Sequence, residues 1–145
     1  MKELIIKLTT RVLPLMGITI LNSCVMYGSP HADFEAKGIV SNEDDKGIQG
    51  IRVVISATPS NPNNTGMPIT DTLWTNHSGE YSSRNDWFAN ENSVKFEFED
   101  VDGPENGGEF QKVEMEVPVF KVKEGDGKWY QGAYEVGANV TMIKK

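Results

Sequence analysis

The sequence predicts an all-β protein, an antiparallel β-sandwich of about seven strands preceded by an N-terminal signal segment. Apolar and polar residues alternate with a period of two from residue 34 onward, the pattern of strands that bury one face. Clusters of Gly, Asn, Asp and Pro interrupt this alternation at short intervals, as turns do in sandwiches. The longest uncharged apolar run, residues 12–21, has ten residues and precedes the alternating part.

The alternation places each strand in turn. Turn-forming residues fill 42–47 and 59–68, and a turn-rich connector is expected at 124–134. Pro118 implies an edge strand or a bulge, because proline has no amide hydrogen to donate. The alternating Phe, Val and Ile residues, together with three tryptophans, are expected to fill a core between two sheets. The expected strands lie within residues 33–42, 48–58, 70–76, 80–84, 93–102, 110–122 and 135–143.

Composition limits the function. The chain has 145 residues and a formal net charge of −7, enough for one domain and an appendage. An acidic body repels phosphate backbones, so a nucleic-acid partner is excluded. The single cysteine excludes an intramolecular disulfide and a cysteine-based zinc site.

The N-terminus has the pattern of a secretory signal. Residues 1–11 carry three basic residues and one acidic residue, and the apolar run 12–21 follows. That run is too short to span a bilayer as a helix, which needs about 20 apolar residues. Small residues then lead to the only cysteine, Cys24.

The stretch "LNSC", residues 21–24, resembles a bacterial lipobox. The resemblance implies that residues 1–23 are a lipoprotein signal peptide and that Cys24 carries acyl chains such as palmitate. Residues 24–33 would then be a tether and residues 34–145 the sandwich domain. Val25 after the cysteine implies anchoring at the outer membrane, facing the periplasm. Cleavage near Ser29, or an uncleaved anchor, are the alternatives.

The body resembles the carboxypeptidase regulatory-like domain, a transthyretin-type β-sandwich, and the expected fold is therefore transthyretin-like or immunoglobulin-like. The whole layout also resembles small lipoproteins encoded beside radical SAM enzymes in Gram-negative anaerobes. Residues 26–38, 79–81 and 100–110 carry this second resemblance. The first is carried by Gly38, Val40, Gly47, Ile48, Gly50, Ile51, Val53, Thr75, Gly79 and Tyr81.

An acidic, glycine-rich segment at 99–110 is a candidate calcium site. Carboxylate and amide oxygens around glycines are the ligands that calcium loops use. The spacing is not that of an EF-hand, and the alternative is a solvated loop whose Asp, Asn and Gly residues form turns. The candidate ligands are Asp100, Asp102, Glu105, Asn106 and Glu109.

Aromatic residues beside polar loops are the candidate binding residues. They can stack on sugars or pack against a partner, and burial in the core is the alternative. Neither His31 nor His77 has an acid and a serine at a spacing that indicates a triad. The aromatic candidates are Trp74, Trp87, Phe88, Trp129 and Tyr130.

These observations predict a lipid-anchored envelope module for binding or assembly, without catalytic activity. No cofactor is expected apart from calcium at the acidic loop. The expected partners are the membrane, through the lipid anchor, and an envelope protein or a glycan. The alternatives are a substrate of a radical SAM modifying enzyme and an envelope hydrolase.

Overall fold

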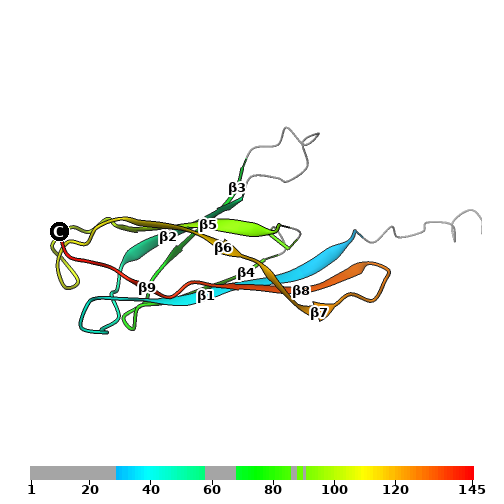
Figure 1. The fold of residues 1–145 in the computed structure, drawn as a ribbon, viewed down its shortest axis with the longest axis horizontal. Coiled ribbons are helices and arrows are strands. Elements are labelled where there is room, and N and C mark those ends of the chain that lie inside the picture. The colour runs from blue at the N-terminus through cyan, green and yellow to red at the C-terminus, as the bar shows by residue number, and fades with distance from the viewer. Residues whose placement is uncertain (1–28, 58–67, 86–87, 90) are drawn as a thin grey trace, which may run out of the picture.

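The computed structural model describes residues 29–57, 68–85, 88–89 and 91–145. These residues form two sheets packed face to face, which confirms the predicted all-β sandwich (Figure 1). The described strands are β1 (His31–Ser41), β2 (Ile51–Ala57), β3 (Ile69–Trp74), β4 (Glu80–Asn85), β5 (Ser93–Asp100), β6 (Val113–Pro118), β7 (Phe120–Glu124), β8 (Tyr130–Gly137) and β9 (Val140–Thr141).

The first sheet has the strand order β4-β1-β8-β7, and β9 pairs with the end of β1. The second sheet has the order β3-β2-β5-β6 and is antiparallel throughout. β1 pairs in parallel with both β8 and β9. The first sheet is therefore mixed, where the alternation alone had suggested antiparallel pairing.

Strict alternation builds the core. In β2, Ile51, Val53 and Ile55 are buried while the residues between them are half-buried, because successive side chains point to opposite faces of a strand. β5 buries Val94, Phe96 and Phe98 in the same way.

Aromatic contacts join the two sheets. The Tyr81 ring on β4 meets the Phe96 and Phe98 rings on β5, with centroids 6.1 and 5.8 Å apart. Phe34 on β1 packs against Phe88 at 5.3 Å. Tilted or edge-on pairs at such distances add to the stability that burial supplies.

Side chains fix the turns that the sequence predicts. Asn42 Oδ1 accepts hydrogen bonds from the amides of Asp44 and Lys46, and Asn76 Oδ1 accepts from those of Ser78 and Glu80. An Asn side chain that bonds to the amide two residues on mimics a backbone turn.

Three strands depart from the sequence-based expectation. β1 begins at His31, inside the expected tether. The predicted strand at 110–122 divides into β6, which ends at Pro118, and β7, which joins the other sheet. β8 begins at Tyr130, inside the expected connector; its register against β1 shifts between Tyr130 and Ala133, where Gly132 has a positive φ.

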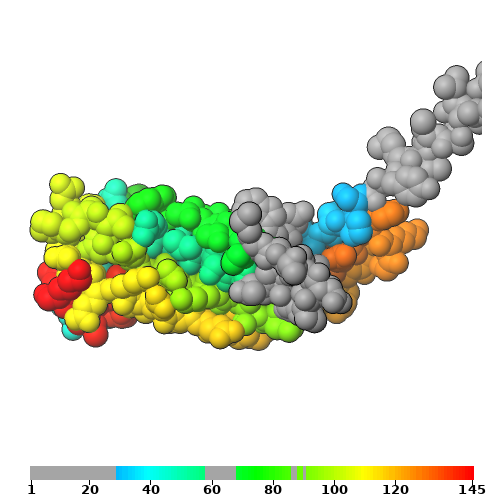
Figure 2. All heavy atoms as spheres, turned by 90° about the horizontal axis from the view of Figure 1, so that it is seen from above, coloured from blue at the N-terminus to red at the C-terminus, as the bar shows by residue number. Residues whose placement is uncertain are grey.

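The molecule is elongated, and different segments of the chain form its two ends. The acidic connection after β5 gathers at one end with the C-terminal segment, and the start of β1 and the β7–β8 hairpin form the other (Figure 2). Along the described part of the chain, no helix is long and apolar enough to cross a membrane.

Candidate functional site

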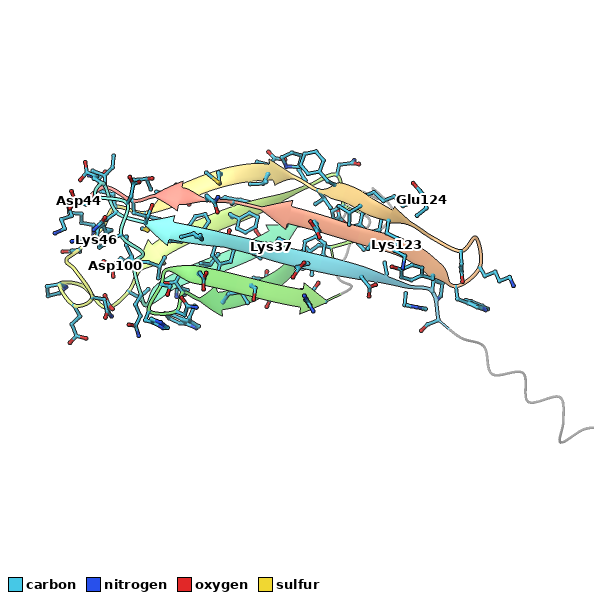
Figure 3. All side chains as sticks on the ribbon, turned by 90° about the horizontal axis from the view of Figure 1, so that it is seen from below. Lys37, Asp44, Lys46, Asp100, Lys123 and Glu124 are labelled. Carbon is cyan, nitrogen blue, oxygen red and sulfur yellow. The ribbon has the colours of Figure 1, made fainter. Side chains whose placement is uncertain are left out.

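The outer face of the first sheet is where polar side chains gather over a hollow. Along β1, Phe34 and Ala36 point into the core, so Asp33, Glu35 and Lys37 point outward. Figure 3 shows this face, with Lys37 midway along β1 and Lys123 near the β7–β8 end. The period of two that builds the core thus also builds a charged row on the opposite side.

A groove of about 590 Å³ lies on this face. All of its lining residues belong to β1, β4, β7 and β8, and Asp33 and Glu35 place it on the outward side of the first sheet. Its volume is in the range of about 300–1,000 Å³ that is usual for small-molecule sites. The lining residues are Ala32, Asp33, Phe34, Glu35, Arg84, Asn85, Val122, Ala133, Tyr134 and Glu135.

Glu35 is the organising carboxylate of the groove. Arg84 Nε and Nη2 both donate to its Oε1, at 3.1 and 3.0 Å, and Lys37 Nζ lies 3.3 Å from its Oε2. Arg84, and then Lys37, lower the pKa of Glu35. The cross-strand register that sets Glu35 opposite Arg84 places this ion pair.

A second cluster lies at the hairpin end of the same face. The Tyr130 hydroxyl donates to Asp33 Oδ2 at 2.9 Å. Lys123 Nζ lies 5.4 Å from the centroid of the Tyr130 ring, and the His31 ring packs against that ring with centroids 5.4 Å apart. Burial, and then the hydrogen bond with Asp33, raise the pKa of Tyr130.

A second groove, of about 600 Å³, continues the face toward the other end of β1. Lys37, Ser82 and Gly137 line it, together with Glu80 and Asn139. Lys37 bonds to Glu35 in the first groove and also lines the second. The two hollows therefore lie in line along one strand.

The predicted calcium ligands serve the loop itself. Asp100 accepts hydrogen bonds from the amides of Asp102 and Phe110, at 3.3 and 3.0 Å. Asn106 bonds to Asp102, and Glu109 pairs with Lys145 at 2.6 Å. The exposed Glu105 has no place in these contacts. Across the described ranges, no group of three or more His, Cys, Asp or Glu side chains could hold a metal ion.

The other predicted site residues divide three ways. Trp74 and Trp129 are about half exposed, at 55% and 48%, so they do not fill the core. Phe88 is fully buried. Cys24, with the expected signal peptide and most of the tether, and Trp87 lie outside the described residues, so acylation of Cys24 stays a prediction.

The groove itself was missed at the sequence level. Its polar residues occupy the outward positions of strands, whereas the sequence analysis used the alternation only to find the inward, buried residues. The one signal was the charged alternation of Asp33, Glu35 and Lys37 on a strand. Which strand lies beside β1 depends on pairing over about a hundred residues, which the sequence pattern does not specify.

Comparison with known proteins finds no matching family model and no matching curated protein. Solved structures are similar in fold. 3-Chlorocatechol 1,2-dioxygenase from Rhodococcus opacus has a TM-score of 0.53 at 9% identity, and catechol 1,2-dioxygenase from Pseudomonas arvilla has 0.54 at 10%. The alignments cover 83% and 82% of this chain, which spans 62% and 54% of those chains.

A third similar structure is the dioxygenase domain of a dioxygenase carbohydrate-binding protein fusion from the cellulolytic bacterium Streptomyces sp. It has a TM-score of 0.53 at 10% identity, and the alignment covers 83% of this chain and 86% of that one. At these identities the likeness shows the fold.

These comparisons correct the family expected from the sequence. The structural neighbours are catechol 1,2-dioxygenase-type domains, and radical SAM-associated lipoproteins or carboxypeptidase regulatory-like domains are not among the structures compared above. The lipoprotein and outer-membrane assignments, which rest on residues 21–25, receive no support from these structures. Gly79 has a left-handed φ in the turn before β4, which unrelated sandwiches use as well.

The expected function is corrected as well. The similar structures are enzymes, so the assignment as a non-catalytic module is wrong. The alternatives, a radical SAM substrate and a hydrolase, do not match these structures either. The expectation of no cofactor, with calcium as the exception, is likewise contradicted, since dioxygenases of this type are non-haem iron enzymes.

The described residues do not fit such an iron site. His31 begins β1, whereas His77 lies in the turn after β3, which packs at the other end of β1 through the Val40 amide and the Gly79 carbonyl (2.8 Å). Within the described ranges, no three His, Cys, Asp or Glu side chains come together as metal ligands. The chain shares its fold with these dioxygenases.

Proposed function

We propose that the domain binds a glycan along the outer face of β1. The observation that carries this proposal is that carboxylates and cationic side chains lie side by side along the outer face of β1, with Glu35 between Arg84 and Lys37. Carboxylates such as Glu35 only accept hydrogen bonds, and Arg84 and Lys37 only donate them. A sugar hydroxyl both donates and accepts, so it can bond to either kind of side chain.

Two further features support a chain of sugars. The two grooves lie in line along β1 on either side of Lys37, which suits an elongated ligand. The ion pairs of Glu35 with Arg84 and Lys37 hold the polar groups in place before a ligand arrives. Such preorganisation reduces the conformational entropy that is lost on binding.

Isothermal titration of the protein with soluble hexasaccharides tests the proposal. The probes are cellohexaose, xylohexaose and the hexamers of glucosamine and N-acetylglucosamine. We expect at least one of them to bind. In the Ala133→Leu variant, whose larger side chain fills the floor of the groove, we expect its affinity to fall at least tenfold.

Val54→Leu is the control for a larger side chain outside the groove, because Val54 is half-buried on the outward side of the other sheet; it adds one carbon, where Ala133→Leu adds three. Binding that Ala133→Leu leaves unchanged would move the site elsewhere. Catechol serves as a competing probe, since two of the similar structures are described as catechol-type dioxygenases. Binding of catechol with no binding of any hexasaccharide would overturn the proposal.

A further inference from the structure

The groove over Ala133 has an excess of negative charge. Three carboxylates, those of Asp33, Glu35 and Glu135, line it against a single lining cation, Arg84. Arg84 is already directed to Glu35. The other two carboxylates, of which Glu135 also lies near Lys37, keep more capacity for a ligand.

Asp33 and Glu135 lie on either side of a small floor. Asp33 is opposite Ala133 in the β1–β8 register, and Glu135 follows Ala133 two residues later on the same face. Their nearest polar partners leave acceptor oxygens in place: Asp33 Oδ2 accepts from Tyr130 at 2.9 Å, and Glu135 Oε1 lies 3.8 Å from Lys37 Nζ. A carboxylate offers about four acceptor positions, so each retains capacity for a second donor.

Resting on the proposed function, we propose that the groove selects a glycan with free amino groups, an amino sugar of the glucosamine type. An ammonium group has three donors and no acceptor. Between Asp33 and Glu135 it makes charge-assisted hydrogen bonds, which are shorter and stronger than neutral ones. The side chain of Ala133 is small enough to let a substituent of the sugar ring approach the sheet between these two carboxylates.

Three hexasaccharides that differ at one ring position separate this inference from the proposed function. The hexamers of glucosamine, N-acetylglucosamine and glucose carry an ammonium, an acetamide and a hydroxyl at that position. We expect the glucosamine hexamer to bind at least tenfold more tightly than the other two at low salt. The preference should shrink as sodium chloride is raised, because salt screens exposed charges.

The double variant Asp33→Asn, Glu135→Gln removes both charges and keeps the side-chain shapes. We expect it to lose the preference for the amine while retaining its affinity for a neutral hexamer. The matched control is Glu97→Gln, Glu114→Gln on the outer face of the other sheet, where both carboxylates pair with lysines. It changes the net charge of the protein by the same amount and should keep the preference.

Each outcome decides one statement. Equal affinity for the three hexamers would overturn the amino-sugar inference and leave glycan binding intact, whereas no binding of any hexamer would overturn both. A preference that survives in the Asp33, Glu135 variant would also contradict the inference. So would a tri-lysine peptide that binds as tightly as the glucosamine hexamer, because the groove would then recognise cations and not sugars.

Discussion

Besides the buried hydroxyl of Tyr81, Thr75 is the one buried polar side chain among the described residues, and it joins the end of β3 to the start of β2. Its hydroxyl accepts from the Ile51 amide at 2.9 Å and donates to the Ile48 carbonyl at 2.6 Å. Both backbone groups lie next to buried side chains, where water does not replace a lost partner. The hydroxyl is therefore a structural requirement of this corner.

We expect Thr75→Val to lower the free energy of unfolding by about 1–3 kcal/mol. The substitution keeps the shape and leaves a buried amide without a partner, which has a cost of that order. Urea denaturation measures the change. Thr72→Val is the control, because Thr72 lies on the exposed side of β3; an equal loss in both variants would mean that the hydrogen bonds of Thr75 are not its cause.

Tyr81 gives the protein a sensitivity to alkaline pH. Its hydroxyl donates to the Ala138 carbonyl at 2.6 Å, and burial raises the pKa of this phenol well above its usual range. The unfolded chain then loses the phenol proton first as the pH rises. This contribution to stability is complete below about pH 10 and is lost above it.

We therefore expect Tyr81→Phe to behave differently at the two pH values. At pH 7 the variant should be less stable by about 1 kcal/mol, because one hydrogen bond is missing. Above pH 10 the difference should shrink, since phenylalanine does not ionise. Urea midpoints between pH 7 and 11.5 test this, with the half-buried Tyr134→Phe as control. A difference that stays constant with pH would contradict the assignment.

Local turn chemistry was the best-predicted feature at the residue scale. Gly79 has φ of +78°, and Asn76 caps the same turn through two amides, as glycine and asparagine do wherever a hairpin needs a left-handed residue. The acidic residues near Asp100 were harder to interpret. Their composition suits both a calcium loop and a turn, and only their partners distinguish the two.

At the scale of elements, β1 organises the first sheet. It pairs with β4 on one side and with β8 and then β9 on the other. Where β8 gives way to β9, the chain passes close to β1, and Gly38 leaves room for it. A Cβ atom at this position would overlap the Ala138 carbonyl oxygen and the Tyr81 hydroxyl.

We expect Gly38→Ala to destabilise the protein by about 1–3 kcal/mol, the usual effect of overpacking a filled site. It should also disturb the hydrogen bond of Tyr81. Gly137→Ala is a matched control on the neighbouring strand, because its Cβ would meet only the Lys37 carbonyl oxygen, at an ordinary 3.5 Å. Thermal melts of the two variants compare them. Equal melting temperatures would show that the chain can move away from position 38.

The elements that alternate cleanly were predicted, and those that bend were not. β2 and β5 keep a period of two throughout. β8 contains Gly132, with φ of +111°, where its register against β1 shifts between Tyr130 and Ala133. A bulge inserts an unpaired residue and interrupts the alternation, so the first half of β8 was read as a connector. Its pairing partner, β1, lies too far away in sequence to be inferred from the pattern.

At the scale of the whole molecule, ion pairs cover the outer faces of both sheets. On the second sheet, Lys95 and Lys112 each contact both Glu97 and Glu114, at distances from 2.9 to 3.2 Å. These contacts lower the pKa of both glutamates. Single exposed pairs contribute little, but a network of four charges on adjacent strands contributes more than isolated pairs.

This network sets how the protein responds to acid. The pKa of each glutamate is lower in the folded chain than its ordinary value of 4.5, so the unfolded chain binds protons first as the pH falls. The stability from the network is therefore present above about pH 4.5 and is lost as the pH falls through the lowered values. Glu35 in the groove follows the same rule, because Arg84 and Lys37 lower its pKa.

We expect the variant Glu97→Gln, Glu114→Gln to be less stable than the parent at pH 7 and to approach it as the pH falls from 4.5 to 3. Urea midpoints across pH 3–8 measure the difference. Glu43→Gln, in the exposed turn after β1, should follow the parent at every pH. If the double variant and the parent differed equally at pH 7 and pH 3, the lysine contacts would not be the source of the acid sensitivity. If 0.5 M sodium chloride removes the pH-dependent change in the stability difference, that change arises from screened surface charges.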